Sequence, residues 1–211
     1  MSKTVNVETY GLRALADRIG FFAGQVATIQ ARALNKAAAN GRTAAKREIV
    51  AQVSLKSAYV LDRLNLRKAS KDNQVAIIAT TRRGISLANY SPRQLTRAVK
   101  DTKRSKGDAL RGIAAGRKQA GVSVSVSQKN GRSRMLGAFM VPRLAGSVSG
   151  GNGMGIFIRI GPGLNHIRHL YGPSVDQVFS GVIVKISGEI ASDFEAEVQR
   201  LVTVELTKLN R

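Results

Sequence analysis

Cysteine is absent from the 211 residues, which excludes disulfide bonds and thiolate metal sites. Only two histidines occur, so a zinc site would need carboxylate ligands, and the sequence offers no suitable spacing. Tryptophan is also absent, and aromatic residues make up only 5% of the chain. No apolar run reaches the roughly 20 residues that span a bilayer, and no signal-type segment opens the chain. We therefore expect a soluble protein made in a cytoplasm, without a cofactor, a metal or a membrane partner.

Acidic residues are scarce, because 13 Asp and Glu stand against 34 Lys and Arg, giving a net charge of +21. The excess is concentrated in residues 82–134, which hold 14 basic and 2 acidic residues. Such a block attracts a polyanion through Coulomb attraction and counterion release. A solvated loop or an acidic protein partner would also account for it. The candidate polyanion-facing residues are Arg82, Arg83, Arg93, Arg97, Lys100, Lys103, Arg104, Lys106, Arg117, Lys118, Arg132 and Arg134.

Two long segments have helical periodicity. Apolar residues recur at steps of three and four from Leu12 to Ala33, and an alanine-rich stretch follows. These small side chains permit close approach of another element or subunit, although high helix propensity alone also explains them. Gly41 predicts a break in this helix. A second helix is predicted from Ser174, its candidate N-cap, to Val202.

The first part of the region between these two helices, up to residue 120, is predicted to contain short elements. We expect a short helix capped by Ser54 and a buried strand over residues 75–79, paired with residues 85–90. Ser91 and Pro92 resemble a helix start and predict a short basic helix. Residues 91–120 as a whole are predicted to be a mobile basic insertion, in a single domain that spans residues 1–211.

The later part of this middle region is richer in strand signals. Alternating Val and Ser over residues 122–127 predict a half-buried strand. The Asn130-Gly131 turn predicts a hairpin with residues 136–141, and residues 156–160 would complete a three-stranded meander. The expected fold class is therefore α+β, with a long N-terminal helix, an antiparallel sheet of hairpins and a C-terminal helix packed on the sheet.

The sequence contains no convincing catalytic constellation. His166 and His169 lie in a turn rich in glycine and proline, where packing or hydrogen bonding is a better interpretation than metal binding. The glycines at 150–155 lack a following helix and a phosphate-binding lysine. No carboxylate pair has the apolar surroundings that tune a general acid. We expect a protein that is not an enzyme.

Three motifs resemble those of the prophage minor tail protein Z family, the tail-completion proteins of long-tailed bacteriophages. The alanine-rich N-terminal helix and the order of elements agree with this family over roughly residues 10–205. The motifs are Gly137-Ala138-Phe139, Gly155-Ile156-Phe157-Ile158-Arg159 and Tyr171-Gly172-Pro173-Ser174-Val175. The resemblance marks as structural motif residues Phe139, Phe157, Arg159, Tyr171, Gly172, Pro173 and Ser174.

The resemblance implies a structural virion protein at the head-proximal end of the tail, which prepares the tail for head joining and passage of the genome end. The partners it implies are the tail terminator, the head-tail connector, possible contact with the DNA end, and other copies of the chain. Because such tails have six-fold symmetry, a closed hexameric ring, assembled in the host cytoplasm, is the leading arrangement. The alternative is a sequence-independent DNA-binding protein outside the tail, which the charge favours but which lacks a visible recognition helix.

Overall fold

A computed structural model describes residues 10–101, 103–142, 154–163 and 166–209. The chain divides into two compact units. Unit 1 comprises Met1–Thr43, Asn65–Ala79 and Lys185–Arg211, and unit 2 comprises Ala44–Leu64 and Thr80–Val184. The long helices α1 (Tyr10–Gln52) and α4 (Val175–Leu209) each contribute residues to both units.

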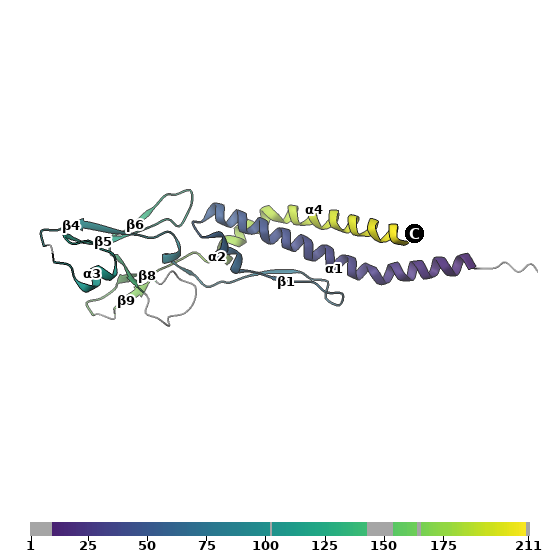
Figure 1. Cartoon of the computed structure of the whole chain (residues 1–211), viewed down its shortest axis with the longest axis horizontal. Helices are drawn as coiled ribbons and strands as arrows, with labels where there is room; N and C mark the ends of the chain where they lie inside the picture. Colours follow the sequence, from purple (N-terminus) through teal and green to yellow (C-terminus); the bar gives the residue numbers. More distant parts are fainter. Residues whose placement is uncertain (1–9, 102, 143–153, 164–165, 210–211) are drawn as a thin grey trace, which may run out of the picture. The chain divides into compact units, whose positions relative to one another are not determined.

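In unit 1, α1 and α4 lie side by side and pack through small and apolar residues (Figure 1). Ile29 and Ala33 of α1 form a buried cluster with Leu201 of α4. Further along α1, the Asn40 side-chain amide donates a hydrogen bond to the Asp193 carboxylate at 2.9 Å. Because contacts later in α1 fall earlier in α4, the two helices are antiparallel here. The alanine-rich face of α1 is therefore a packing surface inside this chain.

Gly41 does not interrupt α1, so the predicted break is wrong. A Cβ atom at this position would lie 2.6 Å from Cδ1 of Ile190 on α4. The glycine therefore permits a close approach of the two helices. This packing outweighs the loss of helix propensity, which is about 1 kcal/mol relative to alanine.

A two-stranded sheet of β1 (Leu64–Arg67) and β2 (Ile77–Thr80) lies mostly in unit 1. Its connecting segment is tied to α1, because the Asn35 side chain donates to the Ala69 carbonyl at 3.0 Å and accepts from the Ala69 N–H at 2.7 Å. The predicted strand at 75–79 thus exists in part, but its partner is β1 and not residues 85–90. It is not buried either, since Val75 is 53% exposed.

The described residues of unit 2 form three small antiparallel sheets and three short helices. The first sheet has the order β4 (Arg93–Ala98), β5 (Arg117–Val124), β6 (Ser133–Met135). The second has the order β7 (Ala138–Pro142), β8 (Met154–Arg159), β9 (Ile167–His169). The third pairs β3 (Ile85–Ser86) with β10 (Tyr171–Gly172). The short helices are α2 (Ser57–Asp62), the 3-10 helix η1 (Leu87–Asn89) and α3 (Lys106–Leu110).

The core of unit 2 is mostly aliphatic and also includes the aromatic residues Tyr90 and Phe179. Val60, Val122 and Ile156 are fully buried. Tyr90 is buried as well, and its hydroxyl donates to the Pro173 carbonyl at 2.6 Å. Burial raises the pKa of Tyr90, so the phenol stays protonated and remains a donor. This hydrogen bond fixes the segment that leads into α4.

Several local predictions for unit 2 are wrong. Residues after Pro92 form β4 instead of a helix, because Ser91 has a left-handed φ of 47°, whereas an N-cap takes an extended backbone. Residues 91–120 contain β4, α3 and the start of β5. Strand β5 pairs with β6 and not with residues 136–141. The three-stranded meander is consequently β7–β8–β9.

The α+β class and both long helices are confirmed. Ser174 caps α4 as predicted, since its hydroxyl accepts from the Gln177 N–H at 3.1 Å. The Gln177 side chain accepts in turn from the Ser174 N–H at 2.9 Å, which completes a capping box. Val175 and Val182 of α4 are buried in unit 2. The pairing of β7 with β8 is also confirmed, while residues 143–153 between them lie outside the described residues.

Candidate functional site

Both histidines make hydrogen bonds, as the sequence indicates, but only His166 lies in a turn, because His169 is the last residue of strand β9. His169 Nε2 lies 2.9 Å from the Ser86 hydroxyl, and its Nδ1 lies 2.9 Å from the Tyr171 hydroxyl. A serine beside a histidine can form a nucleophile and base pair, but Ser86 is buried and its Oγ also accepts from the Ala88 N–H at 3.4 Å. The Gly163 N–H donates to His166 Nδ1 at 3.3 Å. Among the described residues, no group of three or more histidine or acidic side chains could hold a metal ion.

The aromatic motif residues form a continuous stack. Phe139 and Phe157 are cross-strand partners on β7 and β8, with ring centroids 6.3 Å apart. Phe157 stacks on His169 at 4.7 Å, and His169 contacts the Tyr171 ring at 4.4 Å. The Arg111 guanidinium lies 5.7 Å from the Phe139 centroid. This stack connects β7, β8, β9 and β10, so these residues act in packing.

The other motif residues also have structural contacts. Arg159 Nη1 donates to the Gly163 carbonyl at 2.8 Å and closes the turn after β8. Gly172 is not one of the described glycines that have a positive φ angle. Its lack of a side chain is needed because a Cβ there would lie 2.7 Å from the Tyr90 ring. Pro173 accepts the Tyr90 hydrogen bond, and Ser174 caps α4.

All of the candidate polyanion-facing residues fall in unit 2. Five of them are held by contacts to the protein, and the other seven have no side-chain hydrogen bond or ion pair within the described residues. The held residues are Arg82, Arg104, Arg117, Lys118 and Arg132. The others are Arg83, Arg93, Arg97, Lys100, Lys103, Lys106 and Arg134.

The sheet β4–β5–β6 places several of these cations on one face. Arg93 lies opposite Ser123, which lies opposite Arg134, so these residues form a cross-strand row. Arg97 is four residues from Arg93 on β4, beyond a shift in the β4–β5 register between Leu95 and Thr96, and Lys118 lies directly opposite it. The opposite face of β5 carries buried Val122 and Val124. The face that carries Arg93 and Arg134 is therefore basic, although Ser123 between them is buried, and the face that carries Val122 and Val124 packs into the core.

Two cations directly opposite each other on a sheet destabilise it unless one is neutralised. Lys118 Nζ lies 3.1 Å from the Asp108 carboxylate, which also accepts from the Ser105 hydroxyl at 2.7 Å. The Ser105 hydrogen bond, followed by that from Lys118, lowers the pKa of Asp108. Asp108 thus stays ionised beside Lys118, and Arg97 contributes the uncompensated charge of this pair.

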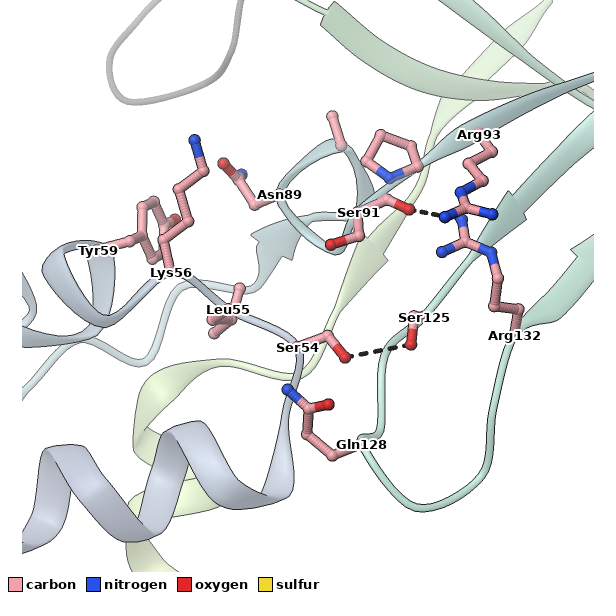
Figure 2. Close-up of a pocket in the computed structure, with 12 residues that line it drawn as sticks. Ser54, Leu55, Lys56, Tyr59, Asn89, Ser91, Arg93, Ser125, Gln128 and Arg132 are labelled. Carbon is pink, nitrogen blue, oxygen red and sulfur yellow. Dashed lines mark hydrogen bonds between the residues drawn. The ribbon is translucent and has the colours of Figure 1, made fainter.

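A cleft of about 700 Å³ adjoins the basic face of the sheet (Figure 2). Three basic side chains line it, and none of its lining residues is acidic. It lies between the segment that joins α1 to α2, the segment after η1, and the β5–β6 loop. The polar and basic lining residues are Ser54, Lys56, Tyr59, Asn89, Ser91, Arg93, Ser125, Gln128 and Arg132.

The walls of this cleft are joined by hydrogen bonds. The Ser54 N–H donates to the Val126 carbonyl, and the Gln128 N–H donates to the Gln52 carbonyl, each at 3.0 Å. The Ser54 and Ser125 hydroxyls lie 3.1 Å apart, as Figure 2 shows. Ser54 is therefore part of the cleft wall and does not cap α2, whose N-cap is Lys56.

Arg132 crosses from the β5–β6 loop to the opposite wall. One of its terminal nitrogens, Nη2, donates to the carbonyls of Ser91 at 2.6 Å and Ser123 at 2.9 Å, and Nε donates to the Ser123 hydroxyl at 3.3 Å. The sequence predicts Arg93 and Arg132 as polyanion-facing but misses Lys56 and Tyr59. Lys56 is the N-cap residue of α2 and Tyr59 lies within this helix, and nothing local indicates that they would meet Arg93.

The sequence matches no known protein-family model, no curated protein and no solved structure. In the described part of the chain, no helix combines the length and hydropathy needed to cross a membrane.

Proposed function

We propose that this chain is a structural virion protein at the head-proximal end of a bacteriophage tail. In this role it completes the tail for head joining and for passage of the genome end. It would act as a closed ring, with six copies as the leading arrangement, between the tail terminator and the head-tail connector. The motif resemblance supplies this assignment, and the aromatic stack and capping box give those motif residues a structural role.

The observation that supports contact with the genome end is the distribution of charge. Unit 2 holds 21 basic and 5 acidic residues, whereas unit 1 holds 13 basic and 8 acidic residues. Unit 2 therefore carries +16 of the net charge of +21. A ring that presents unit 2 to the channel would surround the DNA end with positive charge, while its assembly contacts use other surfaces.

A genetic deletion tests the tail role. A phage that lacks this gene should build tails of normal length that fail to join heads productively, and supply of the protein in trans should restore infectious particles. Mass spectrometry of purified tails should detect the chain, and labelled antibody should bind the head-proximal end. Normal titres of infectious particles from the deletion phage would refute the proposal.

The second candidate function is a sequence-independent DNA-binding protein that is not part of the tail. The seven candidate cations that make no side-chain hydrogen bond or ion pair within the described residues favour it. The two candidates differ in where the protein is found. The DNA-binding alternative predicts that the chain is absent from purified tails and associated with intracellular DNA.

A further inference from the structure

We propose that the cleft in unit 2 binds the phosphates of a nucleic-acid strand. Its volume is about 700 Å³, and Lys56, Arg93 and Arg132 line it without any acidic lining residue to neutralise them. Guanidinium groups match the geometry of phosphate oxygens and bind them through charge-assisted hydrogen bonds. The cleft therefore has both the space and the donors for a phosphate group.

Arg132 is held in place before any ligand arrives. Its Nε and Nη2 atoms donate to Ser91 and Ser123, which leaves Nη1 without a hydrogen bond among the described residues. A guanidinium fixed in this way loses little side-chain entropy on binding an anion. Arg93 lines the same cleft and makes no side-chain hydrogen bond or ion pair to a described residue.

Backbone strain occurs at the same place. Ser91 is the only non-glycine residue with a positive φ in the described part of the chain, at 47°. Its carbonyl accepts the hydrogen bond of 2.6 Å from Arg132, so the strained backbone orients this cation. Residues held in sparsely populated backbone regions concentrate at binding sites, where the surrounding structure stabilises them. This observation is independent of charge and points to the same cleft.

A nucleic-acid strand fits better than a short acidic peptide because the basic surface continues beyond the cleft. Arg93 belongs both to the cleft and to the cross-strand row that reaches Arg134. A polymer with a charge on every residue can occupy the cleft and follow this row. Tyr59 also lines the cleft, but the Arg63 guanidinium already lies over one face of its ring, 4.1 Å from the centroid, so the row of cations and not this ring favours a strand.

This inference deepens the proposed contact with the genome end and rests on that proposal for the identity of the polymer. The test measures binding of the full-length protein to a fluorescein-labelled 20-nucleotide oligothymidylate by fluorescence anisotropy at several salt concentrations. A 20-base-pair duplex and polyglutamate serve as competitors. We expect Arg93→Gln to weaken binding about tenfold or more, as expected for loss of a charge-assisted hydrogen bond. Lys56→Gln should weaken binding in the same direction.

Arg67→Gln and Lys71→Gln are the matched controls, since each removes one exposed positive charge in unit 1, outside the cleft and outside the candidate polyanion-facing residues. They should weaken binding no more than about threefold, the effect of an exposed charge. Arg132→Lys keeps the positive charge but loses the planar guanidinium group. We expect it to weaken binding as Arg93→Gln does. The melting temperature of Arg132→Lys is measured as well, because Arg132 also makes hydrogen bonds within the protein. Arg93 makes no side-chain hydrogen bond to a described residue, so Arg93→Gln tests binding without this complication.

If cleft and control variants lose equal affinity for the oligonucleotide, the inference is overturned, because binding would then depend on total positive charge and not on the cleft. The inference would also be overturned if polyglutamate displaces the oligonucleotide at a lower concentration of negative charge than duplex or single-stranded DNA does. The phage deletion assay separates this result from the tail role. Cleft-dependent DNA binding by a chain that is dispensable for infectious particles would refute the tail role and support the cleft. If the gene is needed for infectious particles but cleft and control variants bind the oligonucleotide equally, the tail role is supported and the cleft is refuted.

Discussion

Substitution of Gly172 by alanine should destabilise the protein through the Tyr90 ring. The added Cβ would lie 2.7 Å from Cε2 of Tyr90 and 3.2 Å from Cδ2 of Leu87. The ring cannot move away easily, because it is fully buried and its hydroxyl is bonded to Pro173 at 2.6 Å. Overpacking of this kind costs about 1–3 kcal/mol. For a chain of this length we expect the melting temperature to fall by roughly 2–12 °C.

Gly181→Ala is the matched control for this prediction. It makes the same chemical change in α4, where no atom lies within 4 Å of the new Cβ. Higher helix propensity should stabilise that variant by up to about 1 kcal/mol. Thermal unfolding followed by circular dichroism compares both variants with the wild type. If Gly172→Ala melts at or above the wild-type temperature, the Tyr90 ring does not restrict this position.

A double-mutant cycle locates the effect. Tyr90→Phe alone removes the hydrogen bond to Pro173 and should cost about 1–3 kcal/mol, because a buried carbonyl loses its partner. Without that bond the ring can shift, so Gly172→Ala should cost less in the Tyr90→Phe background than in the wild type. A coupling of at least about 0.5 kcal/mol is expected for residues in contact. Additive effects would show that the two positions are not coupled through the ring.

Three further predictions concern the helices and the acid region of the pH scale. Ser174→Ala should lower stability by about 1 kcal/mol through loss of the capping box, whereas Ser174→Asp should retain most of it, as urea unfolding would show. Phe194→Ala should cost about 1–3 kcal/mol in a thermal melt, less than the 3–5 kcal/mol of a fully buried ring, because Phe194 is only partly buried. Because the pKa of Asp108 is lowered in the folded state, its carboxylate stabilises the fold at pH values above the ordinary pKa of 3.8. This contribution disappears as the pH falls through the lowered pKa. Asp108→Asn should therefore lose less stability than the wild type between about pH 4 and pH 2, measured as melting temperature against pH.

Elements specified by nearby residues could be predicted from the sequence. The start of α4 depends on Ser174 and Gln177, three residues apart, and both hydrogen bonds of the capping box form. The β7–β8 hairpin depends on two adjacent apolar runs, and the motif residues Phe139 and Phe157 are cross-strand partners within it. In both cases the signal and the contact lie within one element or one hairpin.

Strand partners could not be predicted, because pairing depends on contacts between distant segments. Strand β3 pairs with β10, so Ser86 lies opposite Tyr171 although the two are far apart in the sequence. Strand β4 contains Arg93 and Arg97 with little alternation of apolar residues, so the sequence does not mark it as a strand. Its identity as a strand comes from its pairing with β5 along its length.

The failed helix prediction at Ser91 and Pro92 is informative about function. Serine followed by proline favours a helix start, yet Ser91 is left-handed and the chain continues as a strand. Disagreement between a local preference and the observed backbone is expected at functional sites, where other contacts maintain the strained conformation. Arg132 supplies such a contact at the Ser91 carbonyl, and both residues line the basic cleft. If the strain serves the cleft, Ser91→Gly should preserve oligonucleotide binding, because glycine adopts this φ freely. Ser91→Val should weaken both oligonucleotide binding and stability, since a β-branched residue disfavours that φ. Equal binding by the two variants would show that the conformation of Ser91 does not position Arg132.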